Sequence, residues 1–375
     1  MKKNIYMDAA ASWLKPDSVI RTQVDFLTNF YANAGRGICE RAGHVDNLIA
    51  DSRRVVADFI GAEPENIVFV SGATDALNRV VNILTTQPGY SDISNFAVSD
   101  LDHHSARLPW ENLWHDGKIR KKLICDLDEH LNINIDSVPK TDFLVITAMS
   151  NVLGVKQDVG AIIREARNKN PNVITIVDAS QYIVHEKINV KEWNCDFLVF
   201  SGHKIGADTG VGMLYIKEPD KYFPDKFGGG MINKIIDSEK SSQWIYNKAP
   251  EKFEAGTLPL TQIIGLKYAI MELEKWNKGK DLIDYMYSEL SKIPNIKLIT
   301  SEDACMISFV IKNMHVIDFG ALLGMHNICI RVGNMCASWI HKKLDIDGSV
   351  RLSVGPWNTM DEAKYVIDTI KELVK

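Results

Sequence analysis

A lysine follows one of the most apolar stretches of the sequence. Residues 195–202 read CDFLVFSG, and His203 and Lys204 come directly after them. Partial desolvation at the end of a buried strand makes a lysine amine nucleophilic and suits it to bond covalently to a carbonyl carbon. A lysine that only extends its charged end to water is the alternative interpretation. This segment alone leaves both interpretations open.

An aspartate ends a second apolar stretch, NVITIVDAS at 172–180. Asp178 therefore lies at the end of a predicted buried strand, where a carboxylate needs a partner. The protonated ring nitrogen of pyridoxal 5'-phosphate (PLP) is such a partner, and keeping it protonated makes this cofactor an electron sink. Gln181 would then hydrogen-bond the phenolic oxygen of the ring. A helix-capping role is the alternative for Asp178.

A third segment could bind a phosphate group. Ser71-Gly-Ala-Thr-Asp75 follows the apolar run 66–70 and precedes a helix-like stretch. Small residues such as Ala73 let backbone N–H groups approach an anion at a helix N-terminus, and Thr74 adds a hydroxyl. The motif is shorter than a P-loop, so an ordinary capping turn is the alternative.

The neighbouring His103 and His104 follow a short apolar run at 96–99. A planar imidazole can stack on a cofactor ring and move protons, although a histidine pair in a polar loop often does neither. Adjacent residues of an extended chain point to opposite sides, which disfavours a shared metal ion. The six cysteines form no C-x-x-C pair, so we expect no metal site.

The composition narrows the class of protein. The 375 residues are 46% hydrophobic and 24% charged, with a net charge of -5. This length predicts two to three domains, and the charge disfavours a nucleic-acid or anionic-membrane surface. Sparse cysteines favour a reducing cytoplasm. No apolar run follows the two N-terminal lysines or is long enough to span a membrane, so we expect neither a signal peptide nor a membrane anchor.

The order of apolar segments predicts an α/β fold. Continuous β-branched runs at 66–70, 143–149, 172–180, 195–202 and 210–217 favour strands covered on both faces, and helical periodicity appears at 45–60 and 159–167. After residue 258 the pattern changes to a helix at 262–276, shorter alternating runs and a closing helix at 360–374. That pattern predicts a smaller α+β domain of antiparallel strands.

Taken in order, the motifs resemble those of one family. They are SGATDALN (71–78), DHHSARLPW (102–110), SNVLG (150–154), VDASQ (177–181), FSGHK (200–204), FEAGT (253–257), RVGNMCA (331–337) and VRLSVGPWNT (350–359). This series resembles the class V aminotransferase group of fold-type I PLP enzymes, most closely the NifS-like cysteine desulfurases of the SufS/CsdA type and the selenocysteine lyases. The resemblance implies a large PLP-binding domain at 16–257 with a mostly parallel seven-stranded sheet, and a smaller α+β domain from 1–15 and 258–375.

The resemblance also implies a role for each candidate residue. Lys204 would bond covalently to PLP, Asp178 would pair with its ring nitrogen, and His103 would stack on the ring. The other cofactor contacts would come from Ala73, Thr74, Gln181, Ser201, His203 and, reaching the phosphate of the other subunit, Thr257. The contact of Thr257 with the other subunit implies a homodimer with a shared active site.

The substrate side of the site is implied in the same way. Arg351 resembles the arginine that binds the substrate α-carboxylate, with Asn151 near cofactor and substrate. Cys336 resembles the persulfide-forming cysteine, and Arg331 and Arg351 would favour its thiolate. Relatives often carry two histidines before this cysteine, where this chain has Asn334-Met335.

The expected activity is therefore cysteine desulfuration. L-Cysteine or a related amino acid would yield L-alanine and a persulfide on Cys336, and the sulfur would pass to an acceptor protein or small thiol, as in iron–sulfur cluster assembly. Another PLP-dependent reaction, by an aminotransferase, epimerase or selenocysteine lyase with Cys336 not catalytic, is the alternative. A PLP-binding scaffold without activity is disfavoured because Lys204, Asp178, His103 and Arg351 are all present.

Overall fold

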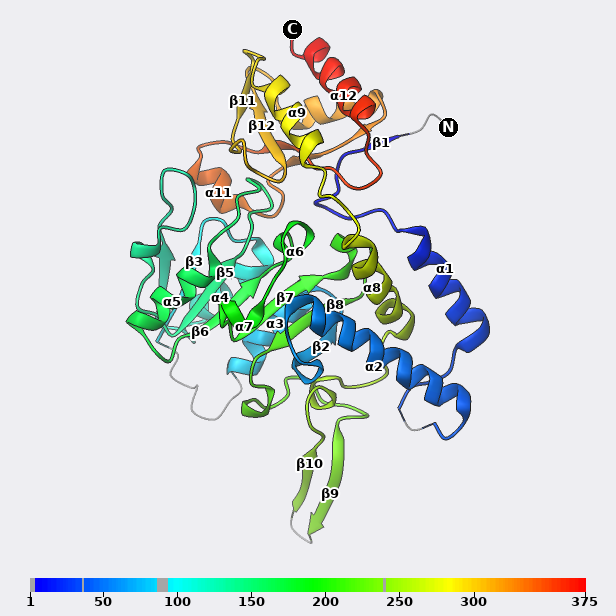
Figure 1. Cartoon of the computed structure of the whole chain (residues 1–375). Coiled ribbons are helices and arrows are strands. Elements are labelled where there is room, and N and C mark those ends of the chain that lie inside the picture. The colour runs from blue at the N-terminus through cyan, green and yellow to red at the C-terminus, as the bar shows by residue number, and fades with distance from the viewer. Residues whose placement is uncertain (1–3, 36, 86–93, 239–240) are drawn as a thin grey trace.

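A seven-stranded sheet forms the centre of the chain (Figure 1). The computed structural model describes residues 4–35, 37–85, 94–238 and 241–375. The strand order is β2-β8-β7-β6-β5-β3-β4, and only β8 runs against its neighbours. The strands are β2 (Ile67–Val70), β3 (Asn95–Ser99), β4 (Lys121–Cys125), β5 (Phe143–Thr147), β6 (Ile174–Asp178), β7 (Phe197–Ser201) and β8 (Gly212–Ile216). The predicted mostly parallel sheet is confirmed.

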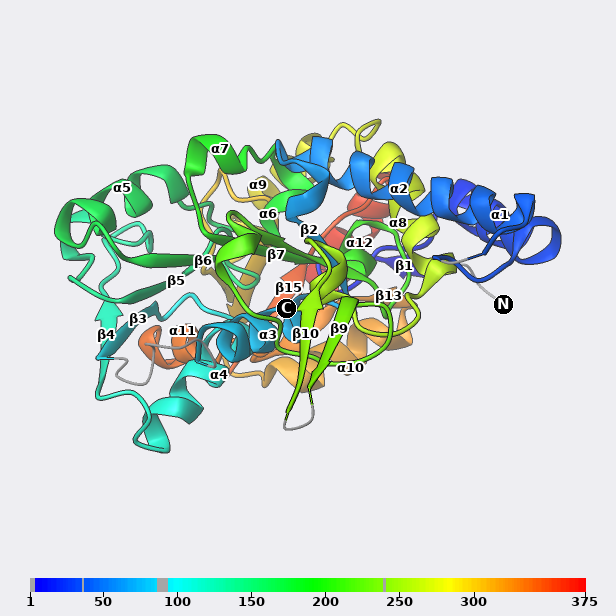
Figure 2. The ribbon, with the colours of Figure 1, turned by 90° about the horizontal axis from the view of Figure 1, so that it is seen from below.

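Helices cover both faces of this sheet (Figure 2). One face packs against α2 (Glu40–Ile60), α5 (Val159–Lys169) and α8 (Leu260–Leu273), and the other against α3 (Ala73–Thr85) and α4 (His104–His115). Along β7, Leu198 and Phe200 belong to the first buried cluster, and Phe197 and Val199 to the second. Burial on both faces explains why these strands are continuously apolar. The shorter helices α6 (Tyr182–His185) and α7 (Val190–Trp193) follow β6.

A second, antiparallel sheet has the order β11-β12-β15-β14. Its strands are β11 (Ile296–Leu298), β12 (Ile307–Ile311), β14 (Arg331–Gly333) and β15 (Ser349–Leu352). A separate buried cluster joins it to α9 (Lys280–Leu290), α10 (Val316–Met325) and α12 (Met360–Leu373). The short β1 (Ile5–Tyr6) runs parallel to β13 (Ile328–Cys329), which brings the N-terminal segment beside this sheet.

The predicted domain division at residue 257 stays a prediction. Ile5 to Asp8 lie beside the second sheet, whereas Ala9 and Trp13 belong to the buried cluster of the central sheet. Residues 1–3 lie outside the described residues. Directly after the predicted boundary, α8 packs against α2 and α1 (Asp17–Asp25), and its buried side chains belong to the cluster of the central sheet.

Several elements differ from the sequence prediction. The helix predicted at 45–60 begins at Glu40, and the one predicted at 262–276 covers Leu260–Leu273. A hairpin of β9 (Ile232–Ser238) and β10 (Ser241–Tyr246) was not predicted, and it projects from the body of the chain (Figure 1).

Two further elements carried weak sequence signals. The edge strand β4 has the sequence KKLIC, whose two lysines interrupt the apolar pattern, and only Cys125 is buried in it. α4 contains Pro109, which is unfavourable inside a helix. The remaining short helix, α11 (Ser338–Lys343), follows the loop that carries Cys336. Among the described helices, none combines the length and apolarity that crossing a membrane requires.

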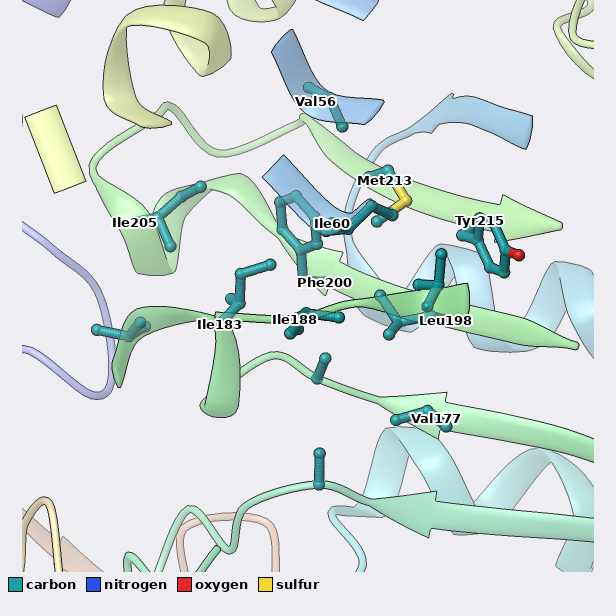
Figure 3. Close-up of a cluster of buried hydrophobic side chains, with 14 of the residues drawn as sticks. Val56, Ile60, Val177, Ile183, Ile188, Leu198, Phe200, Ile205, Met213 and Tyr215 are labelled. Carbon is teal, nitrogen blue, oxygen red and sulfur yellow. The ribbon is translucent and has the colours of Figure 1, made fainter. Parts of the chain in front are cut away.

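Packing around Phe200 fixes the strand that leads to Lys204. Figure 3 shows the Phe200 ring among Ile60 of α2, Met213 of β8 and Ile183 of α6. All four side chains are buried in one cluster. The end of β7 is thus held by helices on one face of the sheet, which gives the following turn a defined position.

Phe200→Ala should lower the free energy of unfolding by about 4 kcal/mol, because the buried ring leaves a cavity that its neighbours only partly fill. Urea unfolding followed by circular dichroism measures the change. Phe227→Ala, which truncates a phenylalanine that is 69% exposed, is the matched control and should change stability little. Equal losses in the two variants would contradict this account of the core.

Candidate active site

A cavity of about 290 Å³ opens beyond the carboxyl ends of the parallel strands. Open α/β sheets place their ligand sites at this edge. Residues from both sheets line it: Ala10, Ala11, Ala73, Thr74, His103, Ser105, Asn151, Asp178, Ser180, Gln181, Ser201, His203, Lys204, Arg331, Met335, Cys336 and Arg351. The structure thus brings together every predicted site residue except Thr257. Ala10, Ala11, Ser105, Ser180 and Met335 were not predicted, because small or apolar side chains carry no signal for chemistry.

The N-terminus of α3 forms one end of the cavity. The Ala73 N–H donates a hydrogen bond to Ser201 Oγ at 2.8 Å, and the hydroxyls of Thr74 and Ser105 lie 2.7 Å apart. A β-carbon on Gly212 would lie 2.7 Å from Gly72 Cα, so this glycine lets β8 and the turn before α3 pack closely. Backbone and hydroxyl donors at the start of a 13-residue helix suit an anionic group.

Asp178 ends β6 at the floor of the cavity and is buried. Its Oδ1 accepts a hydrogen bond from the Ser180 N–H at 3.0 Å, which orients the carboxylate. Gln181 Nε2 donates to the Ala10 carbonyl at 2.8 Å, which ties the N-terminal segment to this edge of the sheet. The second N–H of that amide has no partner in the described hydrogen bonds.

Lys204 lies in a short 3-10 helix (Gly202–Ile205) directly after β7. Burial is the main cause that lowers the pKa of its amine, and the nearby Asp178 carboxylate offsets part of the shift. A lowered pKa increases the fraction of neutral, nucleophilic amine at neutral pH. Its place in the cavity and its lowered pKa favour the nucleophilic interpretation of Lys204 over that of a solvated strand-end lysine.

The two adjacent histidines have different surroundings. His103 lines the cavity and caps α4, where its Nδ1 accepts a hydrogen bond from the Ser105 N–H at 3.2 Å. His104 does not line the cavity, and its Nε2 accepts a hydrogen bond from the Ser338 N–H at 3.2 Å. Burial, followed by the charge of Lys204, lowers the pKa of His103 to about 4, so its ring is neutral at pH 7.

Arg351 is fully enclosed at the other end of the cavity. Its Nη1 donates to the Asn151 carbonyl at 2.7 Å, and its Nη2 lies 3.2 Å from Asp8 Oδ1. Arg331 lies nearer the solvent, with Nη2 2.6 Å from Asp8 Oδ2. The sequence analysis named both arginines as site residues but not Asp8. Asp8 reaches the two arginines only when β1 packs beside the second sheet.

Cys336 lies on the loop after β14 and lines the same cavity as Lys204. Both Met335 and Cys336 have left-handed backbones, with φ of 49° and 54°, which costs on the order of 1 kcal/mol each. Two hydrogen bonds hold this conformation. Asn151 Nδ2 donates to the Met335 carbonyl at 2.8 Å, and the His104 N–H donates to the Cys336 carbonyl at 2.7 Å. The thiol of Cys336 is exposed.

The other five cysteines lie outside the cavity. Cys125 and Cys195 are buried in the core, and burial raises the pKa of each thiol to about 12. Cys305 and Cys329 are partly buried, and burial raises the pKa of Cys305. Cys39 is exposed at the start of α2. Cys336 is therefore the cysteine best placed to react in this cavity.

Thr257 is exposed and does not line the cavity. The predicted contact of Thr257 with a cofactor in the other subunit stays a prediction. Within the described residues, no group of histidine, cysteine and acidic side chains could hold a metal ion.

Four buried polar atoms at the cavity have no hydrogen-bond partner among the described residues: Asn151 Oδ1, Ser180 Oγ, Gln181 Oε1 and Arg351 Nε. A buried polar atom without a hydrogen-bond partner lowers the stability of the fold, so four such atoms around one cavity indicate that a polar ligand binds there. PLP fits the residues present, because the anion-binding end, the Asp178 carboxylate and the Lys204 amine correspond to its phosphate, ring nitrogen and aldehyde carbon.

The fold and this constellation define a class of protein. The model of the Aminotransferase class-V family matches residues 5–366. The chain therefore belongs to the class V aminotransferase family, and both the predicted resemblance and the predicted fold class are confirmed.

Within this family, the chain is similar to several cysteine desulfurases. The chain is 32% identical to a "Probable cysteine desulfurase" of Borreliella burgdorferi, over 99% of this chain and 92% of the relative. The apo structure of the cysteine desulfurase from Thermococcus onnurineus NA1 superposes with a TM-score of 0.92 at 29% identity, covering 99% of this chain and 94% of that one. The Escherichia coli cysteine desulfurase CsdA gives a TM-score of 0.89 at 26% identity, covering 99% and 96%.

The lowered pKa of His103 makes stability depend on pH. The unfolded chain binds a proton at His103 more readily than the folded chain does. The contribution of neutral His103 to the free energy of unfolding is therefore complete above the ordinary pKa of 6.5 and is lost as the pH falls toward 4. His103→Asn keeps a capping acceptor for the Ser105 N–H but cannot titrate in this range. It should reduce the loss of unfolding free energy between pH 7 and pH 5 by about 1 kcal/mol, after allowance for partial solvent exposure.

Urea unfolding of both proteins at the two pH values measures this difference. His130→Asn replaces an exposed histidine outside the active-site cavity and serves as the control, with an unchanged pH dependence expected. If His103→Asn loses as much stability as the parent chain between pH 7 and pH 5, the neutral state assigned to His103 is wrong.

Proposed function

We propose that this chain is a PLP-dependent cysteine desulfurase that converts L-cysteine to L-alanine and forms a persulfide on Cys336. The observation that carries the proposal is that an exposed cysteine, Cys336, lines the same cavity as Lys204 and Arg351. A nucleophilic thiol is of no use to a simple transamination, but it can accept sulfur from a substrate held beside it. The family assignment and the cysteine desulfurase relatives support the same activity.

Different residues would bind the phosphate and the ring of the cofactor. Ala73, Thr74, Ser201 and His203 would bind the phosphate at the start of α3, while Asp178 pairs with the ring nitrogen and His103 covers the ring. The free N–H of Gln181 would reach the phenolic oxygen. When bound, PLP withdraws electrons from the substrate and stabilises negative charge at its Cα.

The protein's own groups would bind and activate the substrate. Arg351 has an unpaired Nε and would bind the α-carboxylate of L-cysteine, with Asn151 beside it. The neutral amine of Lys204 would accept the Cα proton, which its lowered pKa favours. Neutral His103 lies at the same cavity and would move protons to or from the substrate sulfur.

Cys336 would take the sulfur atom. Its thiolate attacks the substrate Sγ, so that an S–S bond forms and the Cβ–Sγ bond breaks. The electron pair of the broken bond stays with the carbon skeleton, which takes up a proton and leaves as L-alanine. Because Cys336 is exposed, an acceptor protein or a small thiol could reach the persulfide without unfolding the loop.

We also infer that two copies of the chain share each active site. Thr257 lies outside the cavity of its own chain and is exposed, which leaves it available to the cofactor phosphate of a partner subunit. A homodimer is the simplest assembly in which both copies make this contact.

Cys336→Ala should abolish desulfuration, since no thiol remains in the cavity to accept the sulfur. L-Alanine formation from L-cysteine, measured with and without a reducing thiol, should fall at least about a hundredfold. Cys39→Ala removes an exposed thiol outside the cavity and should keep parental activity. Undiminished turnover in Cys336→Ala would sink the persulfide role while leaving another PLP reaction open.

Lys204→Ala should remove the covalent attachment of the cofactor. Borohydride reduction followed by peptide mass spectrometry should find PLP bound to Lys204 in the parent chain and no attached cofactor in the variant. Lys221→Ala, at an exposed lysine paired with Glu218, is the matched control and should keep the label on Lys204. Cofactor attached to another lysine of the parent chain would contradict the assignment.

A further inference from the structure

Strand register places three charged residues side by side at the substrate end of the cavity. Arg331 and Arg351 are direct partners across β14 and β15. Tyr6 pairs with Cys329 in the parallel β1–β13 pair, and a bridge joins Asp8 to Ser353. Asp8 is thereby positioned between the two arginines. Like charges that face each other across a strand pair are destabilising unless a counter-charge lies between them.

Asp8 provides that counter-charge with both carboxylate oxygens. Its Oδ2 lies 2.6 Å from Arg331 Nη2, and its Oδ1 lies 3.2 Å from Arg351 Nη2. The side chains of Asp8 and Arg351 are 7% and 3% exposed, whereas that of Arg331 is 48% exposed. Asp8 itself does not line the cavity, so it would act on a substrate only through the arginines.

The three groups sum to one positive charge. One carboxylate of an amino-acid substrate neutralises that charge, and Arg351 Nε remains without a partner in the described chain to receive it. A substrate with a second anionic group beside its Cβ would bring a second negative charge that the single net positive charge of these three groups does not match. Arg331 is the group that could match it, but its guanidinium is already bound to Asp8.

We infer that Asp8 is a specificity-determining residue that restricts the site to amino acids with one carboxylate and an uncharged side chain. It does so by pairing with the Arg331 guanidinium at the cavity, so that this positive charge is already matched before a substrate side chain arrives. This inference rests on the proposed function, since it concerns the amino acid that the desulfurase would bind. It identifies Asp8 as a positioning residue and assigns it no proton or bond in the reaction.

The test measures binding of two amino acids to the PLP-loaded protein by calorimetry. L-Serine carries one carboxylate and has no sulfur for Cys336 to accept, and L-aspartate adds a carboxylate on Cβ. In Asp8→Asn, the ratio of the dissociation constant for L-aspartate to that for L-serine should fall about tenfold, because the freed Arg331 can bind the second carboxylate.

Two further variants separate specificity from structure. Asp8→Asn combined with Arg331→Gln restores a single positive charge and should return the ratio to the parental value. Asp284→Asn, at an exposed aspartate paired with Lys280, should leave it unchanged. A purely structural role of Asp8 would weaken binding of both amino acids equally, and an unchanged ratio in Asp8→Asn would overturn this inference alone. Failure of the parent chain to bind either amino acid would overturn the proposed function as well.

Discussion

Two ionisable groups of opposite charge share a desolvated position at the carboxyl edge of the central sheet. Asp178 ends β6 and Lys204 follows β7, so the parallel pairing of these strands brings the two side chains to one cavity. Burial lowers the pKa of the lysine, and the carboxylate limits that shift. The sheet core keeps both strands in place, and the four unpaired polar atoms around the cavity indicate that a polar ligand completes the arrangement.

The second sheet supplies what the central sheet lacks. Arg351 from β15 and the Cys336 loop after β14 line the same cavity as Asp178. Hydrogen bonds from Asn151 and from the backbone of His104 fix that loop to the turn after β5 and to the start of α4. The proposed cofactor site and the thiol proposed to accept sulfur thus come from different parts of the chain, and packing or hydrogen bonds hold each of them.

Much of this arrangement could be predicted from the sequence, for reasons that individual residues make clear. Asp178 and Lys204 each follow an apolar strand, and the short spacing of VDASQ and FSGHK carries a recognisable local signal. Asp8 carried no such signal, because the role inferred for it depends on two arginines more than 320 residues away. Only the packing of β1 beside the second sheet brings Asp8 to these arginines. The role proposed for Thr257 depends on a second subunit, which the fold of one chain cannot supply. β4 and α4 were missed because lysines and Pro109 mask their local preferences.

The central claim is that Cys336 carries the sulfur of the substrate. The most direct measurement is peptide mass spectrometry of the purified, PLP-loaded protein after brief exposure to L-cysteine labelled with heavy sulfur, with alkylation to trap thiols. The account predicts one additional, labelled sulfur atom on the peptide that contains Cys336, removed by a reducing thiol. An unmodified Cys336 with labelled sulfide free in solution, or labelled sulfur on another cysteine, would contradict it.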